Sequence, residues 1–172
     1  MNSATAEPWN LGWDDWLETL PAAKRHEAIA LASTFRALGA PDPESWVRSQ
    51  VDEGIPQLAR FVFLQNLWKA VDARADADVL DAHPQAARLI AAGGSRDDVA
   101  FLARVSAFDA MMDVIGLIDN GRADDLGDQL PGWCLVQTDE GYRPTDRVVG
   151  GLHESFTSLD PSGREAEDLL YE

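Results

Sequence analysis

The stretch Ile55 to Val71, IPQLARFVFLQNLWKAV, is the most apolar run in the chain and predicts the central helix of the fold. Large apolar side chains recur on one broad face of this helix, and Phe63 and Leu64 extend the apolar surface around the cylinder. A helix that is apolar nearly all round is buried on several sides. We therefore expect the rest of the chain to pack around this segment.

The helical pattern is interrupted just before this stretch by Gly54 and Pro56. Because Pro56 lacks an amide donor and crowds the carbonyl of Asp52, the helix either kinks here or breaks and restarts. Buried amides and charges must be paired, so a polar cluster beside the interruption either specifies helix packing or lines a pocket. The candidate binding residues are Glu53, Gln57 and Arg60.

A second well-buried helix is predicted from Ser95 to Asp119. Ser95 with Asp98 three residues later resembles a capping box, and Gly121 stops the helix. Asp109 and Asp113 share one face, where they would either hold a hard cation or form a solvated or Arg-paired stripe. The apolar face, which we expect to pack on Ile55 to Val71, consists of Phe101, Leu102, Val105, Phe108, Met112 and Ile115.

The remaining segments predict short helices and one β-hairpin. Residues 1–10 are polar and read as a flexible tail, and three helical segments follow within residues 11–53. Residues 72–85 form an Asp-rich linker with one short turn at Val79 and Leu80, and residues 86–92 a small helix. WCLVQT and YRPTDRVV predict an antiparallel hairpin at about residues 133–149, joined by the three-residue turn DEG. Residues 151–165 read as ordered but irregular, and Arg164 to Leu170 as a closing helical turn.

The predicted fold class is therefore mainly α: a single-domain bundle of five to six helices with a small C-terminal β-hairpin and an irregular tail. A chain of 172 residues can bury roughly 70% of the surface that its unfolded form exposes. We expect one domain to cover residues 11–172. An exposed apolar helix face and a buried one read alike in sequence, so the oligomeric state stays open.

The net charge of −16, from 30 acidic and 14 basic residues, bears on the possible partners. Binding of nucleic acid depends on clustered Lys and Arg, so we do not expect a nucleic-acid ligand. A basic protein partner would be attracted by the acidic field, although excess charge can also serve solubility alone. The charge thus favours a protein partner over a polyanion.

Several absences point to a cytoplasmic protein. Cys134 is the single cysteine, so no intramolecular disulfide forms, as is usual in a reducing cytoplasm. The first residues carry no signal-peptide pattern, and no stretch approaches eighteen consecutive apolar residues. The predominance of Arg over Lys and the abundance of Ala indicate a GC-rich, bacterial-type genome. We expect no membrane association.

His153 and Glu154, in GGLHES, are the candidate catalytic residues. An imidazole beside a carboxylate suits general acid or base chemistry, and Ser155, Asp160 or Glu165 would complete the set. Adjacent side chains rarely point the same way, however, and no spacing typical of a known mechanism surrounds them. The alternative is that His153 hydrogen-bonds its own loop.

Neither a metal nor a cofactor is predicted. His26, His83 and His153 lie far apart, without zinc-ligand or di-iron spacing. No phosphate-binding glycine loop, nucleophile elbow or Cys–His pair occurs.

The segments SQVDEGIPQLARFVFLQNLWKAV, residues 49–71, and GLHESFTSLDPSGRE, residues 151–165, resemble the two characteristic segments of a small, uncharacterised bacterial protein family. The intervening helix from Ser95 and the strand headed by Trp133 are also similar. The resemblance implies a bacterial cytosolic protein and transfers no site residue.

Two functions follow from these observations. The first is a non-catalytic, acidic protein-interaction module that binds a basic partner, as an immunity or antitoxin-like protein does. The second is a small enzyme or ligand-binding protein that uses His153 and Glu154 with the polar cluster near Pro56.

Overall fold

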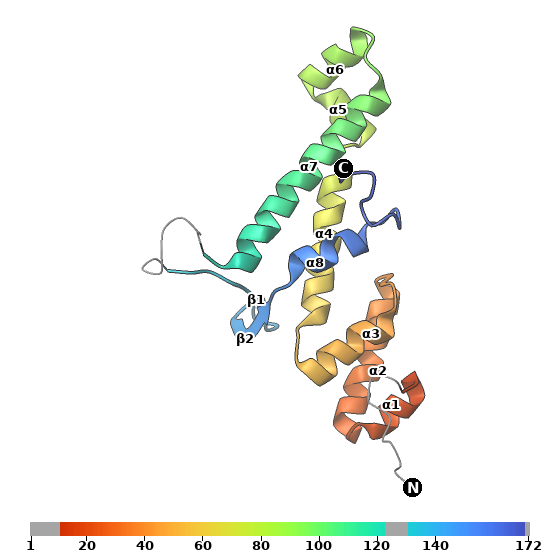
Figure 1. Cartoon of the computed structure of the whole chain (residues 1–172), viewed down its shortest axis with the longest axis vertical. Helices are drawn as coiled ribbons and strands as arrows, with labels where there is room; N and C mark the ends of the chain where they lie inside the picture. The colour runs from red at the N-terminus through yellow and green to blue at the C-terminus, as the bar shows by residue number, and fades with distance from the viewer. Residues whose placement is uncertain (1–10, 123–130, 171–172) are drawn as a thin grey trace. The chain divides into compact units, whose positions relative to one another are not determined.

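The computed structural model describes residues 11–122 and 131–170, and these residues are mainly helical (Figure 1). The tail predicted for residues 1–10 and much of the loop before the hairpin, residues 123–130, lie outside the described residues. By contact density the chain divides into two compact units, Met1–Leu58 and Ala59–Glu172. The single domain predicted over residues 11–172 stays a prediction.

The described residues form eight α-helices and one two-stranded sheet, which confirms the mainly helical class. The helices exceed the predicted five to six because the Asp-rich linker forms α5 and the segment after the hairpin forms α8. In chain order the elements are α1 Trp13–Thr19, α2 Ala22–Ala37, α3 Pro43–Arg48, α4 Gln57–Asp72, α5 Ala77–Ala82, α6 Pro84–Ala91, α7 Arg96–Asn120, β1 Leu135–Thr138, β2 Pro144–Val149 and α8 Leu152–Phe156.

In the first unit, α1, α2 and α3 enclose a small core. Trp16, Phe35 and Val47 are each at most 1% exposed. Asp42 begins α3 in the left-handed region, with φ of 43°, and its side chain accepts from the Ser45 amide at 3.4 Å. This cap, followed by a proline in the first turn, fixes where the helix starts.

The interruption near Pro56 is a break and not a kink. After α3 the chain passes directly into a π-helical turn, Ser49–Glu53, which ends at Gly54 with φ of 75°. The next helix, α4, restarts at Gln57. The amide of Leu58, in its first turn, donates to Gln50 Oε1 at 2.9 Å. A side-chain amide therefore replaces an acceptor that the broken helix cannot supply.

The second unit is built on α4, α7 and α8, as the prediction of a buried helix pair requires (Figure 1). Trp68 of α4 is fully buried, and its ring lies 5.7 Å from Phe108 of α7 and 4.8 Å from Phe156 of α8. Its indole Nε1 donates to the Phe156 carbonyl at 2.7 Å. Trp68 thus joins all three helices of this core.

The start and end of α7 are as predicted, but part of its apolar face is not covered. Ser95 Oγ accepts from the Asp98 amide at 3.3 Å, and Gly121 ends the helix with φ of 68°. Val105, Phe108 and Ile115 are buried, whereas Phe101 is 48% and Leu102 63% exposed. The core formed with α4 and α8 covers α7 only from Val105 onward.

The hairpin prediction is confirmed, with a longer loop than expected. Leu135 pairs with Val149, and Thr138 with Pro144. The loop therefore runs from Asp139 to Arg143 instead of spanning only DEG, and Asp139 Oδ1 accepts the amides of Gly141 at 2.8 Å and Arg143 at 3.0 Å. Pro144 stands at the strand end, where its missing donor removes no internal ladder bond.

After α8, a 3-10 turn leads into a segment organised by the buried carboxylate of Asp160. This group accepts from Ser162 Oγ at 2.6 Å and from the Ala166 amide at 3.0 Å, and lies 3.3 Å from Arg104. Burial opposes its ionisation, but these hydrogen bonds and the Arg104 charge hold the pKa of Asp160 below its ordinary value. The segment after α8 is therefore ordered, as the sequence predicted.

None of the described helices combines the length and apolar character needed to cross a membrane.

Candidate functional site

The first candidate site is the start of α8, where His153 and Glu154 lie. Gly151 precedes the helix in the left-handed region, with φ of 63°, and Leu152 is fully buried. The buried Leu152 holds this turn on the core, while the next two side chains are exposed. The predicted pair is therefore presented at the surface on a fixed backbone.

His153 is paired with Asp119, from the last turn of α7. Asp119 Oδ2 lies 2.7 Å from His153 Nδ1 and accepts from the His153 backbone amide at 3.0 Å. The Asp119 side chain is 8% exposed and the His153 side chain 53%. A carboxylate that accepts the Nδ1 proton leaves Nε2 as the ring nitrogen that can exchange a proton.

Arg60 of α4 lies beside this pair. The guanidinium donates to the Gly151 carbonyl, and the Arg60 residue is only 9% exposed. A Cβ added at Gly151 would lie 3.0 Å from Arg60 Nη2 and 3.5 Å from Glu154 Oε2, so the absence of a side chain lets both charged groups approach. Burial lowers the pKa of Arg60, and the charges of Glu154 and Asp119 oppose that shift.

The cluster of Arg60, Asp119, His153 and Glu154 thus places one cation, two carboxylates and an imidazole around one glycine. Two of its buried atoms, Arg60 Nε and Asp119 Oδ1, have no hydrogen-bond partner within the described residues. Unpaired buried polar atoms are costly, and they are found where strain or a ligand accounts for them. This arrangement suits proton transfer at His153 Nε2 or binding of a small polar group.

The three predicted binding residues have different hydrogen-bond partners and exposure. Gln57 is buried and its Nε2 donates to Ser49 Oγ at 2.7 Å, within the first unit. Glu53 is exposed on the π-helical turn, and Arg60 donates to Gly151 in the second unit. The helix break between Glu53 and Gln57 separates side chains that a continuous helix would have placed on one face.

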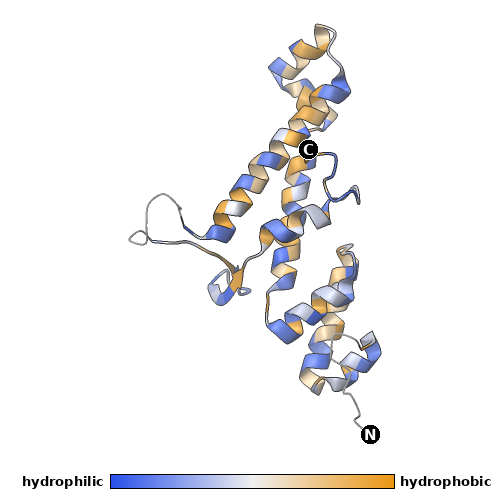
Figure 2. Ribbon diagram, in the orientation of Figure 1, coloured by the Kyte–Doolittle hydropathy of each residue, from blue (hydrophilic) through white to orange (hydrophobic). Residues whose placement is uncertain are grey.

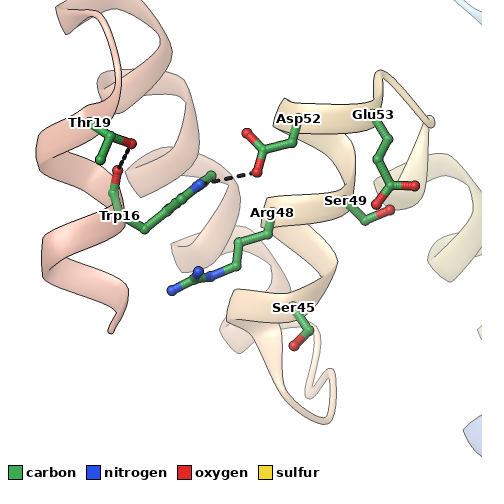
Figure 3. A pocket seen from close by; sticks show the side chains of 7 residues that line it. All are labelled: Trp16, Thr19, Ser45, Arg48, Ser49, Asp52 and Glu53. Carbon is green, nitrogen blue, oxygen red and sulfur yellow. Dashed lines mark hydrogen bonds between the residues drawn. The ribbon is translucent and has the colours of Figure 1, made fainter. Parts of the chain in front are cut away.

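Glu53 instead lines a pocket of about 660 Å³ in the first unit (Figure 3). Trp16 Nε1 donates to Asp52 Oδ2 at 3.1 Å, and the Arg48 guanidinium carbon lies 5.0 Å from the Trp16 ring centre. Asp52 and Arg48 are therefore both held by Trp16. The other lining residues are Thr19, Ser45 and Ser49.

The predicted third members of a catalytic set have other surroundings. Asp160 is buried among its own loop amides and Arg104. Within the described residues, neither Ser155 nor Glu165 forms a hydrogen bond with His153. The residue that pairs with His153 is Asp119, 34 positions earlier in the chain, which sequence reasoning did not find. Only its place at the end of a helix, next to the stop glycine, distinguishes it from the other Asp residues.

The described residues contain no group of three or more His, Cys, Asp and Glu side chains arranged to hold a metal ion. Asp109 and Asp113 are exposed on α7, as a solvated stripe would be. His26 and His83 are exposed on α2 and before α6.

No family model, curated protein or solved structure matches the chain. The resemblance of residues 49–71 and 151–165 to a small bacterial family therefore stays a prediction.

Proposed function

We propose that this chain is a non-catalytic, acidic protein-interaction module that binds a basic protein partner, in the manner of immunity and antitoxin proteins. The observation that carries the proposal is the unequal use of the two charge signs. Among the described residues, the exposed acidic side chains outnumber the exposed basic ones, and several basic side chains contact the fold itself. A partner therefore meets a surface on which acidic groups predominate.

Three arginines illustrate how the cations are used. Arg25 donates to the carbonyls of Leu17 at 2.8 Å and Leu20 at 3.3 Å, closing the end of α1. Arg104 lies 2.9 Å from Asp72 and 3.5 Å from Asp168. Arg60 is buried at Gly151.

Four of the exposed acids lie on α7. Asp97, Asp98, Asp109 and Asp113 are all exposed, and none of them forms an ion pair within the described residues. An acidic surface of this kind speeds association with a basic partner and gives a rate that falls with salt. We place the module in a bacterial cytoplasm, in keeping with the single cysteine and the family resemblance.

The test is capture of a partner by the tagged chain from lysate of its own organism, at low and at high salt. We expect a protein of high isoelectric point at low salt that is lost at high salt and that binds again when purified. Two variants that each neutralise four acids are compared. The first changes Asp97, Asp98, Asp109 and Asp113 of α7 to Asn. The second changes Asp14 and Asp15 to Asn and Glu18 and Glu27 to Gln, on α1 and α2, and should reduce the salt dependence of binding less. If no basic protein binds at either salt concentration, the proposal is wrong.

A second function, a small enzyme or ligand-binding protein, is favoured by the Asp119–His153 pair beside Arg60. An imidazole oriented by a carboxylate is the usual form of a general base. Hydrolysis of p-nitrophenyl acetate tests whether this histidine is activated. His153→Asn should then remove far more of the rate than His26→Asn, which removes an exposed histidine on α2. Equal losses would leave His153 with a structural role only.

A further inference from the structure

We propose that the groove between α5, α6 and α7 is the docking surface of the basic partner and that it receives a cationic amphipathic helix. This inference rests on the proposed interaction function and assigns it a place. The groove has a volume of about 630 Å³. Orange ribbon marks the apolar residues of α5 and α7 in this region in Figure 2.

The walls of the groove carry large apolar side chains that no described element covers. Leu89 of α6 is 59% exposed, Leu102 of α7 63% and Val79 of α5 41%. Apolar patches of this kind on a folded protein mark sites of interaction. The α7 side of the groove is lined by Ala103, Ala107 and Ala110, which recur at helical spacing. These small side chains leave room for the side chains of another helix.

Charge identifies the occupant. Residues 72–120, which contain the groove, hold nine Asp and four Arg. Two of these arginines are paired with aspartates, Arg96 with Asp81 at 2.6 Å and Arg104 with Asp72 at 2.9 Å, which leaves seven aspartates and two arginines. A second copy of a chain of net charge −16 would bring like charges together, so a basic partner fits better than self-association.

No acidic side chain among the described residues lines the groove itself, but two lie on a stripe of α7 that continues from its lining residues. Asp109 and Asp113 follow Leu102 and Ser106 along one stripe of α7, at i+7 and i+11 from Leu102. Both are exposed. Arg74 also lines the groove. A helix with apolar residues at i, i+3, i+4 and i+7 would fill the groove, and lysines beside that face would reach the two aspartates.

Labelled synthetic peptides of about 18 residues, roughly five helical turns, test this directly by fluorescence anisotropy. One peptide places Leu at i, i+3, i+4 and i+7 with Lys elsewhere. A second has the same composition in scrambled order, and a third replaces Lys by Glu. We expect the amphipathic cationic peptide to bind about tenfold more tightly than the scrambled one, because only ordered apolar residues enter the groove. The Glu peptide should not bind.

Matched variants of the full chain localise the binding. Leu89→Ser with Leu102→Ser should lower the affinity for the cationic amphipathic peptide about tenfold, since both leucines line the groove. The control, Ile29→Ser with Leu117→Ser, removes two leucine-sized side chains that are 51% and 55% exposed outside it and should change little. Asp109→Asn with Asp113→Asn should weaken binding about threefold at low salt, and the difference should vanish at high salt.

The outcomes distinguish a failure of the docking proposal from a failure of the proposed interaction function. The groove would not be the docking surface if the ordered and scrambled cationic peptides bound equally. The same would follow if the groove variant and the control variant lost the same affinity. Either result would still allow an acidic binding surface. Failure of both cationic peptides at low salt would overturn the proposed function as well. A dimer in sedimentation equilibrium that Leu89→Ser with Leu102→Ser abolishes would identify a second copy as the occupant and refute the proposal.

Discussion

Replacing Trp68 by Phe tests whether one side chain organises the second unit. Trp68 is fully buried and contacts Phe108 and Phe156, and its indole donates to the Phe156 carbonyl at 2.7 Å. The substitution keeps an aromatic ring in place but removes the donor and part of the ring volume. Both losses fall at the junction of α4, α7 and α8.

The expected cost has two parts. Leaving the carbonyl without this donor in a buried position costs about 1–3 kcal/mol. The space vacated by the second ring adds about 1–2 kcal/mol, because a packed core relaxes only partly around a cavity. The free energy of unfolding should therefore fall by about 3 kcal/mol.

Urea unfolding followed by far-UV circular dichroism measures this change from the shift in midpoint at constant slope. The matched control is Trp133→Phe. Trp133 is 44% exposed, and its indole also donates at 2.7 Å, to the Leu117 carbonyl. Water can replace that bond, so we expect a loss below about 1 kcal/mol. Equal losses for the two variants, or a loss below about 1 kcal/mol for Trp68→Phe, would refute the reasoning.

Three further changes test other parts of the chain. The folded-state pKa of Asp160 lies below its ordinary value, so its ionised form stabilises the fold above about pH 4. This contribution is lost as the pH falls through the folded-state pKa. In Asp160→Asn, the midpoint of urea unfolding should therefore fall less steeply as the pH is lowered. Gly151→Ala should lower the free energy of unfolding by about 1–3 kcal/mol, because the added Cβ strains a left-handed backbone and lies 3.0 Å from Arg60. Gly163→Ala should lower it less, because its added Cβ meets nothing within 4 Å. Gln50→Ala should speed amide hydrogen exchange in the first turn of α4 roughly tenfold, and an unchanged rate would show that its side chain is not needed there.

Sequence predicted the features that depend on neighbouring residues. The cap at Ser95, the stop at Gly121 and the hairpin at about residues 133–149 each follow from local backbone preferences. The helix α5 was predicted only as one short turn at Val79 and Leu80, although its start carries a cap, with Asp76 accepting from the Asp78 amide at 2.9 Å. Its Asp-rich composition masked a helix that buries only Leu80.

The candidate site was less predictable because it depends on distant residues. Periodicity assigned Leu102 to a helix face but could not show that the covering elements end before it. His153 meets Asp119 across 34 positions, and no spacing in the chain marks that pair. The cluster of Glu53, Gln57 and Arg60 assumed a continuous helix, but the π-helical turn and the restart of α4 changed the register of Glu53 relative to the other two.

The use of arginine connects the stability of the fold with its proposed role. The chain has twelve Arg and two Lys, and a guanidinium can donate several hydrogen bonds at once in a fixed plane. Arg104 uses this geometry to join Asp72, Asp160 and Asp168, and Arg25 uses it on carbonyls at the end of α1. Cations held in this way stay on the groups that they already contact and do not pair with further exposed acids. The attraction for a basic partner should therefore follow the exposed acids rather than the net charge, and neutralising aspartates on α7 should reduce the salt dependence of binding more than an equal charge change on α1 and α2.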